Sequence, residues 1–280
     1  MSRPPMELWV EELQHGDVRL GLRSNTVLHR EVSEFQEILV VDTIRYGRAL
    51  LLDGTFQVTE KDEFAYHEML AHLPLMSHPA PKRVLVIGGG DGGTIREVVR
   101  HPEVEEAILC EIDPRVTAVS REFLPQVAAG LSDPRVTVLH EDGIAYIEKH
   151  QGAFDVILID STDPVGPAVG LYSEAFYAAC KRALRDGGIV CAQSESPFVN
   201  GDVVRRVATS VRSAFSHSLL YLAPLPTYPS GTWSYTAGSD HPLPRHVDKE
   251  RAARLGTRYY TAAVHEAAFA LPPFAAALIE

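Results

Sequence analysis

Cysteine is scarce in this sequence. The three present, Cys110, Cys180 and Cys191, are too few and too scattered for a disulfide framework or a cysteine-based metal site. Long apolar runs are absent as well, since no stretch approaches the roughly 20 residues that a membrane-spanning helix needs. Near the N-terminus, acids stand where a signal peptide carries its apolar stretch. We therefore expect a cytoplasmic protein with reduced thiols and no membrane partner.

Basic residues are the minority among the charged ones. The chain has 26 Lys plus Arg against 37 Asp plus Glu, a formal net charge of −11. This balance argues against nucleic acid as a partner, because phosphates require a basic face. It is compatible with a cationic ligand, but many soluble proteins are simply acidic. The positions of the acids therefore matter more than their sum.

The first part of the chain carries short strand patterns separated by turn signals. The expected strands are Asp17–Leu22, Glu37–Val41 and Arg48–Leu52, which predict a small antiparallel β unit. From about Asp62 the apolar residues take helical spacing, and Pro74 is expected to end that helix. We therefore divide the chain into an N-terminal β domain, residues 1–61, and a catalytic domain, residues 62–280.

The second part alternates strands with helices. The strands are apolar and nearly continuous: Arg83–Ile87, Glu106–Cys110, Val136–Leu139, Asp155–Ile159 and Gly188–Ala192. The helices are expected over Thr94–Arg100, Pro114–Phe123, Ile144–His150 and Glu174–Leu184. This alternation predicts an α/β fold with a mostly parallel sheet covered on both faces. Two later apolar stretches, Ser218–Leu222 and Trp233–Ala237, are expected to complete the sheet as a hairpin.

Carboxylates follow four consecutive strands of this core. The first strand runs into Gly88–Gly93, a GxGxxG loop that contains Asp91; Glu111 stands 18 residues after Gly93. The third and fourth strands lead to Asp142-Gly143 and to Asp160. Any single one of these acids could be a helix cap or a turn residue. Because ligands of such sheets bind at the carboxyl ends of the strands, four acids in register predict one acidic crevice.

Asp91 distinguishes between the ligands that a glycine loop can hold. In a dinucleotide site the pyrophosphate lies against this loop, and a carboxylate there repels it by several kcal/mol at intermediate dielectric. A sulfonium nucleoside with an ammonium tail is attracted instead. Glu111 is placed to accept both hydroxyls of a ribose. The loop therefore favours a cationic nucleoside over NAD.

A second acid, Asp163, follows Asp160 in a loop stiffened by Pro164 and Pro167. Two carboxylates three residues apart can share a cationic amine, although Asp163 before proline is also typical of a turn. A free alkylamine has a pKa near that of lysine, about 10.4, so it must lose a proton before it attacks carbon. We predict that Asp160 accepts this proton and that Asp163 anchors the amine.

Two tyrosines are further candidates for the amine site. Tyr66 and Tyr228 can each orient an amine by a hydrogen bond while the ring covers the methylene chain. A core or interface role is the more common one for either. For His67 the common alternative is a surface or capping histidine, and with His72 and His78 it lacks metal-ligand spacing. No metal site is predicted.

Several segments together resemble the spermidine synthases, of the bacterial type. The similar segments cover nearly the whole chain: LDG and DEFAYHEM in residues 52–69, GGGDGGTIREVVRHP, CEID, DSTDPVGPA, PTYPSG and RYYTAAVHEAAFALP. Each is a moderate signal, and their order and spacing together are specific. The resemblance implies a small N-terminal β domain before a methyltransferase-like Rossmann core with a seven-stranded sheet. It also implies a homodimer or homotetramer, with no metal and no tightly bound cofactor.

The resemblance further implies the reaction and the residues that perform it. The donor would be decarboxylated S-adenosylmethionine, the acceptor putrescine, and the products spermidine and methylthioadenosine. The implied residues for the nucleoside are Gln36, Asp91, Glu111, Asp142, Gly143 and, near the adenine, Pro167. Those implied for the amine are Tyr66, His67, Asp91, Asp160, Asp163 and Tyr228, with Gln57 and Gln193 as further contacts. Some members of the family carry Gln in place of His67.

Three other functions stay open from the sequence. The first is the same transfer to another amine, such as spermidine, agmatine or cadaverine, because acceptor length depends on the pocket beyond Asp163. The second is a methyltransferase that uses intact S-adenosylmethionine, which leaves Asp91 and the Asp160/Asp163 pair unexplained. The third is a polyamine-binding regulator on an enzyme scaffold. Product identification with both forms of the donor and a panel of amines distinguishes them.

Overall fold

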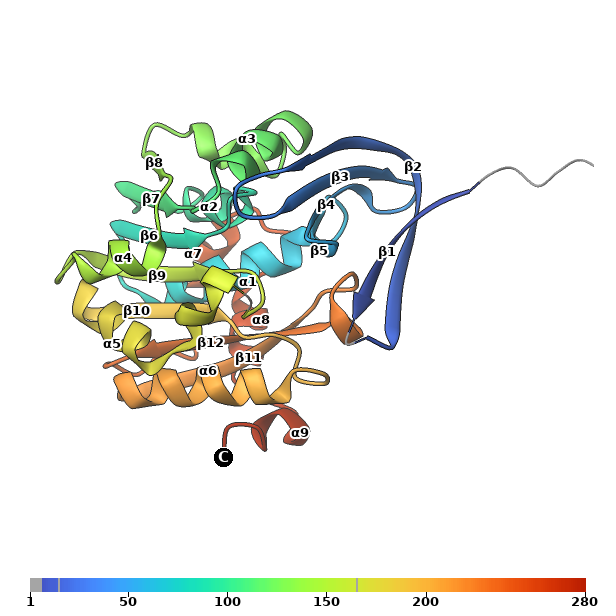
Figure 1. The fold of residues 1–280 in the computed structure, drawn as a ribbon. Helices are drawn as coiled ribbons and strands as arrows, with labels where there is room; N and C mark the ends of the chain where they lie inside the picture. The colour runs from blue at the N-terminus through green and yellow to red at the C-terminus, as the bar shows by residue number, and fades with distance from the viewer. Residues whose placement is uncertain (1–6, 15, 165) are drawn as a thin grey trace, which may run out of the picture.

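The protein is described by a computed structural model that covers residues 7–14, 16–164 and 166–280 (Figure 1). Its strands are β1 Leu8–Gln14, β2 Val18–Val32, β3 Glu37–Thr43, β4 Gly47–Leu52, β5 Thr55–Thr59, β6 Arg83–Gly88, β7 Glu106–Cys110, β8 Val136–Leu139, β9 Phe154–Asp160, β10 Leu184–Gln193, β11 His217–Pro224 and β12 Thr232–Ser239. Its α-helices are α1 Glu63–Ser77, α2 Gly93–Val98, α3 Pro114–Phe123, α4 Gly143–Glu148, α5 Glu174–Ala183, α6 Gly201–Ala214, α7 Lys249–Arg254, α8 Ala262–Ala267 and α9 Pro273–Ala276. Short 3-10 turns span η1 Ala128–Ser132, η2 Gly166–Tyr172 and η3 Pro229–Gly231.

The N-terminal strands form an antiparallel meander in the order β1-β2-β3-β4-β5 (Figure 1). The predicted small antiparallel β unit is therefore confirmed. The sequence patterns missed β1 and β5. In β1 the side chains that are buried belong to Glu12 and Gln14, whereas Leu13 is exposed, so the strand shows no apolar alternation. The Glu12 carboxylate accepts a hydrogen bond from the backbone amide of Phe56 in β5, which explains why an acid occupies an inward position.

The second sheet has the strand order β11-β12-β10-β9-β6-β7-β8 within the described residues. The pairs from β8 to β10 are parallel, while β12 is antiparallel to both β10 and β11. The predicted α/β fold with a mostly parallel, seven-stranded sheet is confirmed. The predicted closing hairpin is confirmed as well, with its second strand inserted between β10 and β11. The division into domains at residues 61 and 62 stays a prediction.

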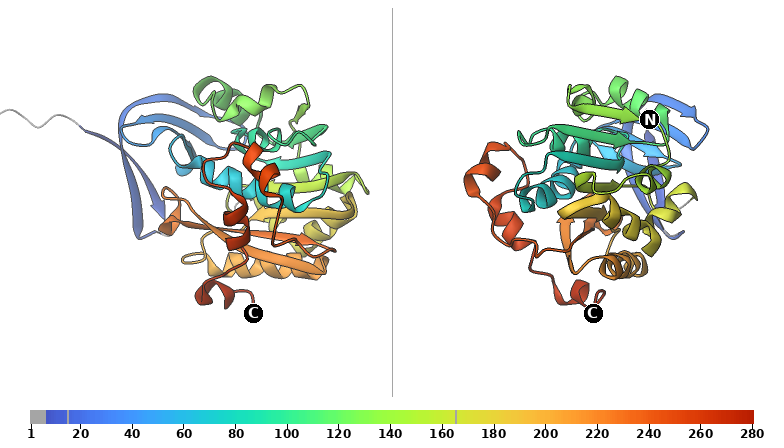
Figure 2. Two further views of the ribbon diagram at one scale, coloured as in Figure 1. Left: turned by 180° about the vertical axis from the view of Figure 1, so that it is seen from behind. Right: turned by 90° about the vertical axis from the view of Figure 1, so that its left-hand side faces the viewer.

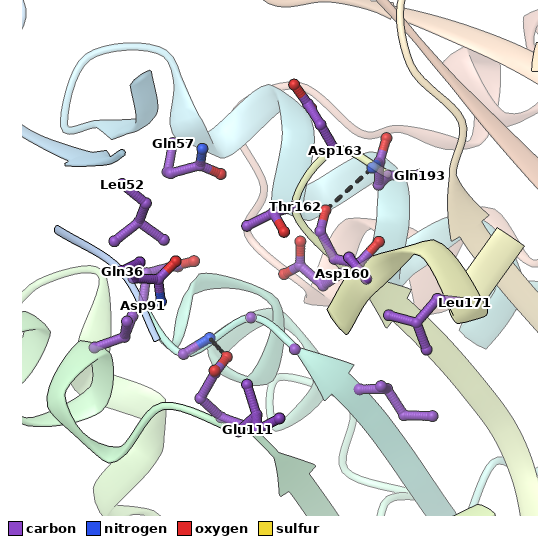
Figure 3. Close-up of a pocket in the computed structure, with 18 of the residues that line it drawn as sticks. Gln36, Leu52, Gln57, Asp91, Glu111, Asp160, Thr162, Asp163, Leu171 and Gln193 are labelled. Carbon is purple, nitrogen blue, oxygen red and sulfur yellow. Dashed lines mark hydrogen bonds between the residues drawn. The ribbon is translucent and has the colours of Figure 1, made fainter. Parts of the chain in front are cut away.

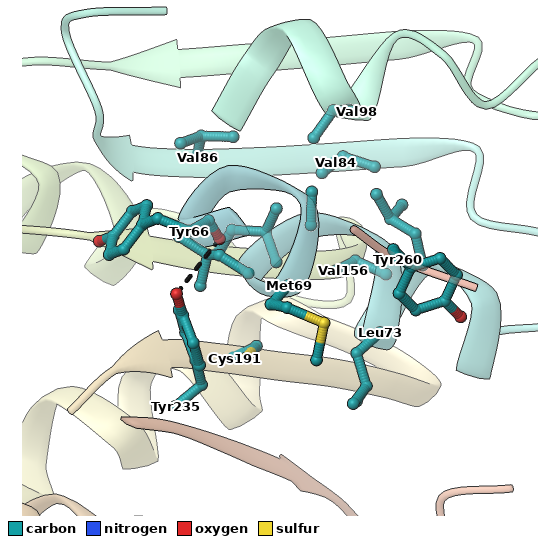
Figure 4. Close-up of a cluster of buried hydrophobic side chains, with 14 of the residues drawn as sticks. Tyr66, Met69, Leu73, Val84, Val86, Val98, Val156, Cys191, Tyr235 and Tyr260 are labelled. Carbon is teal, nitrogen blue, oxygen red and sulfur yellow. Dashed lines mark hydrogen bonds between the residues drawn. The ribbon is translucent and has the colours of Figure 1, made fainter. Parts of the chain in front are cut away.

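Helices cover both faces of this sheet (Figures 1 and 2). Alternate residues of β6 serve the two faces: Val84 and Val86 pack with α1 and α2, and Leu85 and Ile87 pack on the side of α4, α5 and α6. Figure 4 shows the first of these clusters, where the Tyr235 hydroxyl donates a hydrogen bond to the carbonyl of Tyr66 at 3.3 Å. This fixes the start of α1, which carries site residues, against the sheet.

The helix after the N-terminal unit is longer than predicted. Pro74 was expected to end it, but α1 continues to Ser77. A proline in a helix interior lacks the N–H that would bond the residue four positions earlier, so it is costly there. Here it stands in the final turn, and its own carbonyl accepts the amide of His78, which closes the helix. The patterns also missed α6 and the C-terminal helices α7 to α9.

Three contacts tie the N-terminal sheet to the second sheet. The buried carboxylate of Asp62, just before α1, accepts the Thr59 hydroxyl of β5 at 2.6 Å and the Thr227 amide and hydroxyl at 3.0 and 2.7 Å, so it joins β5 to the loop after β11. Arg48 donates to the carbonyl of Phe123 at the end of α3. In addition, apolar residues of β3, β4 and β5 form one cluster with α3. The face of the N-terminal sheet is thereby held over the carboxyl ends of the parallel strands.

The C-terminal tail crosses the back of the molecule and lies along α1 (Figure 2, left). Its anchor is Glu68, a buried residue of α1 whose carboxylate accepts the backbone amides of Arg258, Tyr259 and Tyr260 at 2.7–2.8 Å. Three amide donors satisfy a buried carboxylate that would otherwise be costly. None of the helices in the described ranges is long and apolar enough to cross a membrane.

We predict that Glu68→Gln destabilises the protein by about 1–3 kcal/mol, because the amide side chain cannot accept all three hydrogen bonds and leaves buried N–H groups unsatisfied. The shift of the urea unfolding midpoint at constant slope measures this loss. The matched control is Glu266→Gln on the exposed side of α8, which should change the free energy of unfolding by less than about 0.5 kcal/mol. Equal midpoints for the two variants would contradict the anchoring role.

Candidate active site

A cavity of about 460 Å³ lies at the carboxyl ends of β6, β7 and β9, roofed by the N-terminal sheet (Figure 3). All four strand-end acids line it, so the predicted acidic crevice exists. The other predicted site residues that line it are Gln36, Gln57, Tyr66, His67, Gly143, Asp163, Gln193 and Tyr228. The side chain of Pro167 lies outside the described residues. The roles of these residues stay predictions.

The glycine loop is shaped by the carboxylates that pack on it. Gly88, Gly89 and Gly92 have positive φ, a region that other residues rarely adopt. A Cβ on Gly89 would lie 2.6 Å from an Asp160 carboxylate oxygen, and one on Gly90 would lie 2.8 Å from Cγ of Glu111. The loop therefore needs glycine both for its backbone and for the approach of two acids.

At one end of the cavity Glu111 is held by backbone amides. Its carboxylate accepts the amide of Gly90 at 3.1 Å and that of Asp113 at 2.9 Å (Figure 3). Burial raises the pKa of Glu111 to about 7, against the pull of these two donors. Gln36 reaches the same end from the N-terminal sheet, where its amide donates to Asp113 at 3.0 Å.

Asp142 and Asp91 also make the bonds expected of structural acids. Asp142 caps α4 by accepting the amide of Ile144 at 2.8 Å, and Asp91 accepts the amide of Gly93 at 2.7 Å. Both nevertheless line the cavity. The capping interpretation and the functional one are therefore compatible, because a cap uses only part of the acceptor capacity of a carboxylate.

Asp160 occupies the centre of the cavity and is buried. The hydroxyls of Tyr66 and Thr94 donate to its two oxygens at 2.7 and 2.6 Å. Burial raises the pKa of Asp160, and the charge of nearby Asp91 raises it further. A carboxyl group that binds its proton more tightly is the better proton acceptor from an amine.

His67 does not fit the alternative of a surface or capping histidine. It is buried, and both ring nitrogens face carboxylates: Nδ1 lies 2.5 Å from Glu63 and Nε2 lies 3.3 Å from Asp91. Although burial opposes the charge, these two acids raise the pKa of His67 to about 10. The ring therefore brings a positive charge into an otherwise acidic cavity.

His67, Asp91 and Asp160 are also close enough to suggest metal binding, since one ligand atom of each lies within 4.8 Å of the others. A metal requires a lone pair on the imidazole. Both nitrogens of His67 face carboxylates that raise its pKa to about 10, so a metal would have to compete with protons for the ring. The arrangement is better suited to binding an organic cation through Asp91 and Asp160 than to binding a metal ion.

The opposite end of the cavity surrounds Asp163 (Figure 3). Gln193 donates to the carbonyl of Ser161 at 3.1 Å and to the Tyr172 hydroxyl at 2.7 Å, which ties the Asp160–Asp163 loop to β10. The Tyr228 hydroxyl donates to the carbonyl of Gln57 at 2.6 Å. Both candidate tyrosines thus line the site, and Tyr228 also joins the two sheets across it.

Sequence reasoning missed three groups beside the cavity. Thr94 hydrogen-bonds Asp160, the Glu63–Arg96 pair stands behind His67, and Glu195 follows β10. Burial raises the pKa of Glu195 well above its ordinary value, and the neighbouring Asp163 raises it further. Glu195 could have been found, because it is an acid just past a strand end. The other two carry no local signal.

Comparisons with known proteins agree with this geometry. Residues 63–249 match the spermine/spermidine synthase domain, and residues 8–60 match the spermidine synthase tetramerisation domain. A polyamine aminopropyltransferase of Moorella thermoacetica is 50% identical over 273 residues, which cover 98% of this chain and 96% of the relative. One of Desulforudis audaxviator is 46% identical over 271 residues, 97% of this chain and 98% of the relative.

Solved structures give the same result. A spermidine synthase in complex with the transition state analogue AdoDATO superposes with a TM-score of 0.95 at 41% identity, covering 99% of this chain and 96% of the other. A spermidine synthase of Thermotoga maritima superposes with a TM-score of 0.94 at 41% identity, with the same coverage. On the fold, the acidic cavity and these matches, the chain belongs to the spermidine synthase family.

Proposed function

We propose that this protein transfers the aminopropyl group of decarboxylated S-adenosylmethionine to putrescine, giving spermidine and methylthioadenosine. Aminopropyl transfer to give spermidine is the activity of its family, and the spermidine synthase structures it matches cover nearly the whole chain. The single observation that carries the proposal is the buried Asp160, which shares one cavity with Asp91 of the glycine loop and with Asp163.

The donor end of the cavity fits a nucleoside with a cationic tail. In this proposal Glu111 accepts the ribose hydroxyls, with Gln36, Asp142 and Gly143 on the nucleoside. The family resemblance assigns Pro167 to the adenine, although its side chain lies outside the described residues. Asp91, within the glycine loop, attracts the sulfonium and the ammonium tail by charge. Intact S-adenosylmethionine carries an additional carboxylate at that tail, which Asp91 would repel, so the geometry favours the decarboxylated donor.

The acceptor amine enters between Asp160 and Asp163. Asp163, with Tyr228, Gln57 and Gln193 nearby, holds the distal ammonium. The near amine gives its proton to Asp160, and its lone pair then attacks the carbon next to sulfur. The S–C bond breaks, its electron pair stays on sulfur, and a neutral thioether leaves. Because the leaving group needs no protonation, holding the amine in line with that bond is the main task of the site.

The remaining features of the proposal follow from this chemistry. The electrophile is supplied by the donor, a co-substrate, so no cofactor is needed. The exposed apolar residues of the N-terminal strands, among them Trp9, Leu13 and Val18, support assembly into a homodimer or homotetramer through the segment that matches a tetramerisation domain. Three free, buried cysteines support a cytoplasmic location.

Product analysis tests the reaction class and the acceptor together. We expect purified protein with decarboxylated S-adenosylmethionine and putrescine to yield spermidine and methylthioadenosine by mass spectrometry. Spermidine, agmatine and cadaverine serve as competing acceptors, and intact S-adenosylmethionine as the competing donor. A methylated amine would overturn the aminopropyl assignment, and faster turnover of another amine would overturn putrescine as the acceptor.

Asp160→Asn should lower kcat by about 10²–10⁴-fold, because the amide cannot accept the amine proton, while methylthioadenosine binding changes little. The matched variant is Asp163→Asn, three residues away, which should act mainly by raising the KM for putrescine. Steady-state kinetics and nucleoside titrations separate the two effects. If Asp160→Asn keeps kcat within a few-fold of the unchanged protein, Asp160 is not the base.

Nucleoside binding should depend on pH through Glu111. Accepting ribose hydroxyls requires the carboxylate, and the pKa of Glu111 in the ligand-free cavity is about 7. Below pH 7 the residue must lose a proton on binding, so the Kd for methylthioadenosine should rise by about tenfold for each unit by which the pH is lowered. Above pH 7 the Kd should not depend on pH. Titration calorimetry between pH 5.5 and 8.5 measures this. Glu111→Gln should bind weakly and lose the dependence; an unchanged slope in that variant assigns the titration to another group.

A further inference from the structure

The surroundings of His67 leave the ring one protonation state. A neutral imidazole has one N–H donor and one lone pair. Here Nδ1 faces a Glu63 oxygen at 2.5 Å and Nε2 faces an Asp91 oxygen at 3.3 Å. Either neutral form would turn a lone pair toward a carboxylate in a buried place. With both acids ionised, only the doubly protonated ring satisfies both contacts.

Glu63 is itself held as a carboxylate by a second buried ion pair. Arg96, from the neighbouring helix α2, donates two hydrogen bonds to the two Glu63 oxygens at 3.1 and 2.8 Å. Its Nε donates to Glu97 at 2.7 Å, which fixes the orientation of the guanidinium. The planar fork of arginine suits this two-point contact, and lysine could not reproduce it. The order is thus Arg96, Glu63, His67, Asp91, with charges alternating in sign.

The ring also has no freedom to turn away. It lies against the start of α2, where a Cβ on Gly93 would come within 2.2 Å of its Cε1 atom. Its own helix supplies Glu63 on one side, and the Tyr66 ring packs edge-on at 5.2 Å. The position of the charge is therefore fixed relative to Asp91.

A fixed cation matters because Asp91 and Asp160 lie close together. Oxygens of the two carboxylates and a nitrogen of His67 all lie within 4.8 Å of one another. Two carboxylates at such a separation cannot both ionise easily, and one of them retains a proton. If Asp160 retained it, the base of the proposed reaction would already be occupied.

We propose that Glu63 and Arg96 are positioning residues that hold His67 as an imidazolium, and that this cation offsets the charge of Asp91 so that Asp160 can accept the amine proton. The inference rests on the proposed function for its second half. Its first half, the charge of His67, stands on geometry alone and is tested without turnover.

The groups that face this pair agree with the assignment. The neighbouring cation holds the pKa of Asp91 low against its burial, and His67 and Arg96 together lower the pKa of Glu63 to about 2 despite burial. The other titratable groups that face Asp160 are the phenols of Tyr66, Tyr228 and Tyr235. Burial raises their pKa well above the ordinary value, so they stay neutral. Among the described residues, His67 is thus the cation that pairs with Asp91 and lies within 4.8 Å of Asp160.

Imidazole ¹⁵N shifts of histidine-labelled protein test the charge directly, with His67→Gln used to assign the signal. We expect both nitrogens of His67 to remain protonated through pH 8.5. In Glu63→Gln its pKa should fall by about one to three units, because an opposite charge is lost. The control, Glu106→Gln, also removes a carboxylate from an arginine, but at the amino ends of β6 and β7, far from the cavity at their carboxyl ends. It should leave the signal unchanged. A neutral His67 at pH 7, or an unaltered titration in Glu63→Gln, overturns the proposal.

The pH profile of kcat/KM for the amine tests the consequence for the base. Without the cation the pKa of Asp160 rises further. When the pH is lowered, the variant should therefore lose activity at a higher pH than the unchanged protein does. We expect His67→Gln to move the acid limb upward by about one unit or more, with Glu63→Gln moving it less and in the same direction. Methylthioadenosine binding serves as the check that each variant folds.

The double variant separates positioning from a general structural effect. If Glu63 acts through His67, Glu63→Gln should add no shift in the His67→Gln background. Additive shifts would show that Glu63 acts independently and would overturn its positioning role. A protein that fails to turn over any amine but retains a charged His67 would contradict the proposed function and leave the assignment of the cation intact, so the two failures are distinguishable.

Discussion

Mutual repulsion among carboxylates is the constraint on which the site depends. Acids from four strand ends converge on a cavity of about 460 Å³, and two of them, Asp91 and Asp160, are close enough to compete for one proton. The protein stabilises them by different means. Backbone amides hold Glu111, hydroxyls hold Asp160, and an imidazolium accompanies Asp91. Burial raises the pKa of Glu111 and Asp160, whereas the imidazolium keeps that of Asp91 low, and this difference lets neighbouring carboxylates perform different tasks.

The fold brings the acids together, and the contacts between its two sheets enclose the cavity. Parallel strands bring their carboxyl ends to one edge, so acids far apart in the chain meet there. The N-terminal sheet is held over that edge by the contact of Asp62 with Thr227 and that of Tyr228 with Gln57. Enclosure strengthens every charge interaction inside, because less water screens it. Enclosure of the cavity thus both strengthens the binding of cations and raises the pKa of the proposed base, Asp160.

The core was predictable because its strands are apolar on both faces and its helices follow at regular intervals. The bounds of β7, β8 and α3 were predicted to the residue. Prediction failed where another constraint prevailed. β1 turns Glu12 inward to bond a backbone amide, and Pro74 stands in the last turn of α1, where its carbonyl accepts the amide of His78. The C-terminal helices depend on Glu68, 190 residues away from the amide of Arg258.

The sequence by itself determined the fold class, the glycine loop and the acids at the strand ends, because these are set by local pattern and by the order of strands. Tertiary structure alone decided which of those acids binds its proton tightly and which does not. The charge of His67 is the clearest case. It depends on Glu63 one turn earlier, on Arg96 from another helix and on Asp91 from a loop. No local pattern encodes a protonation state, because burial and the sum of neighbouring charges set it.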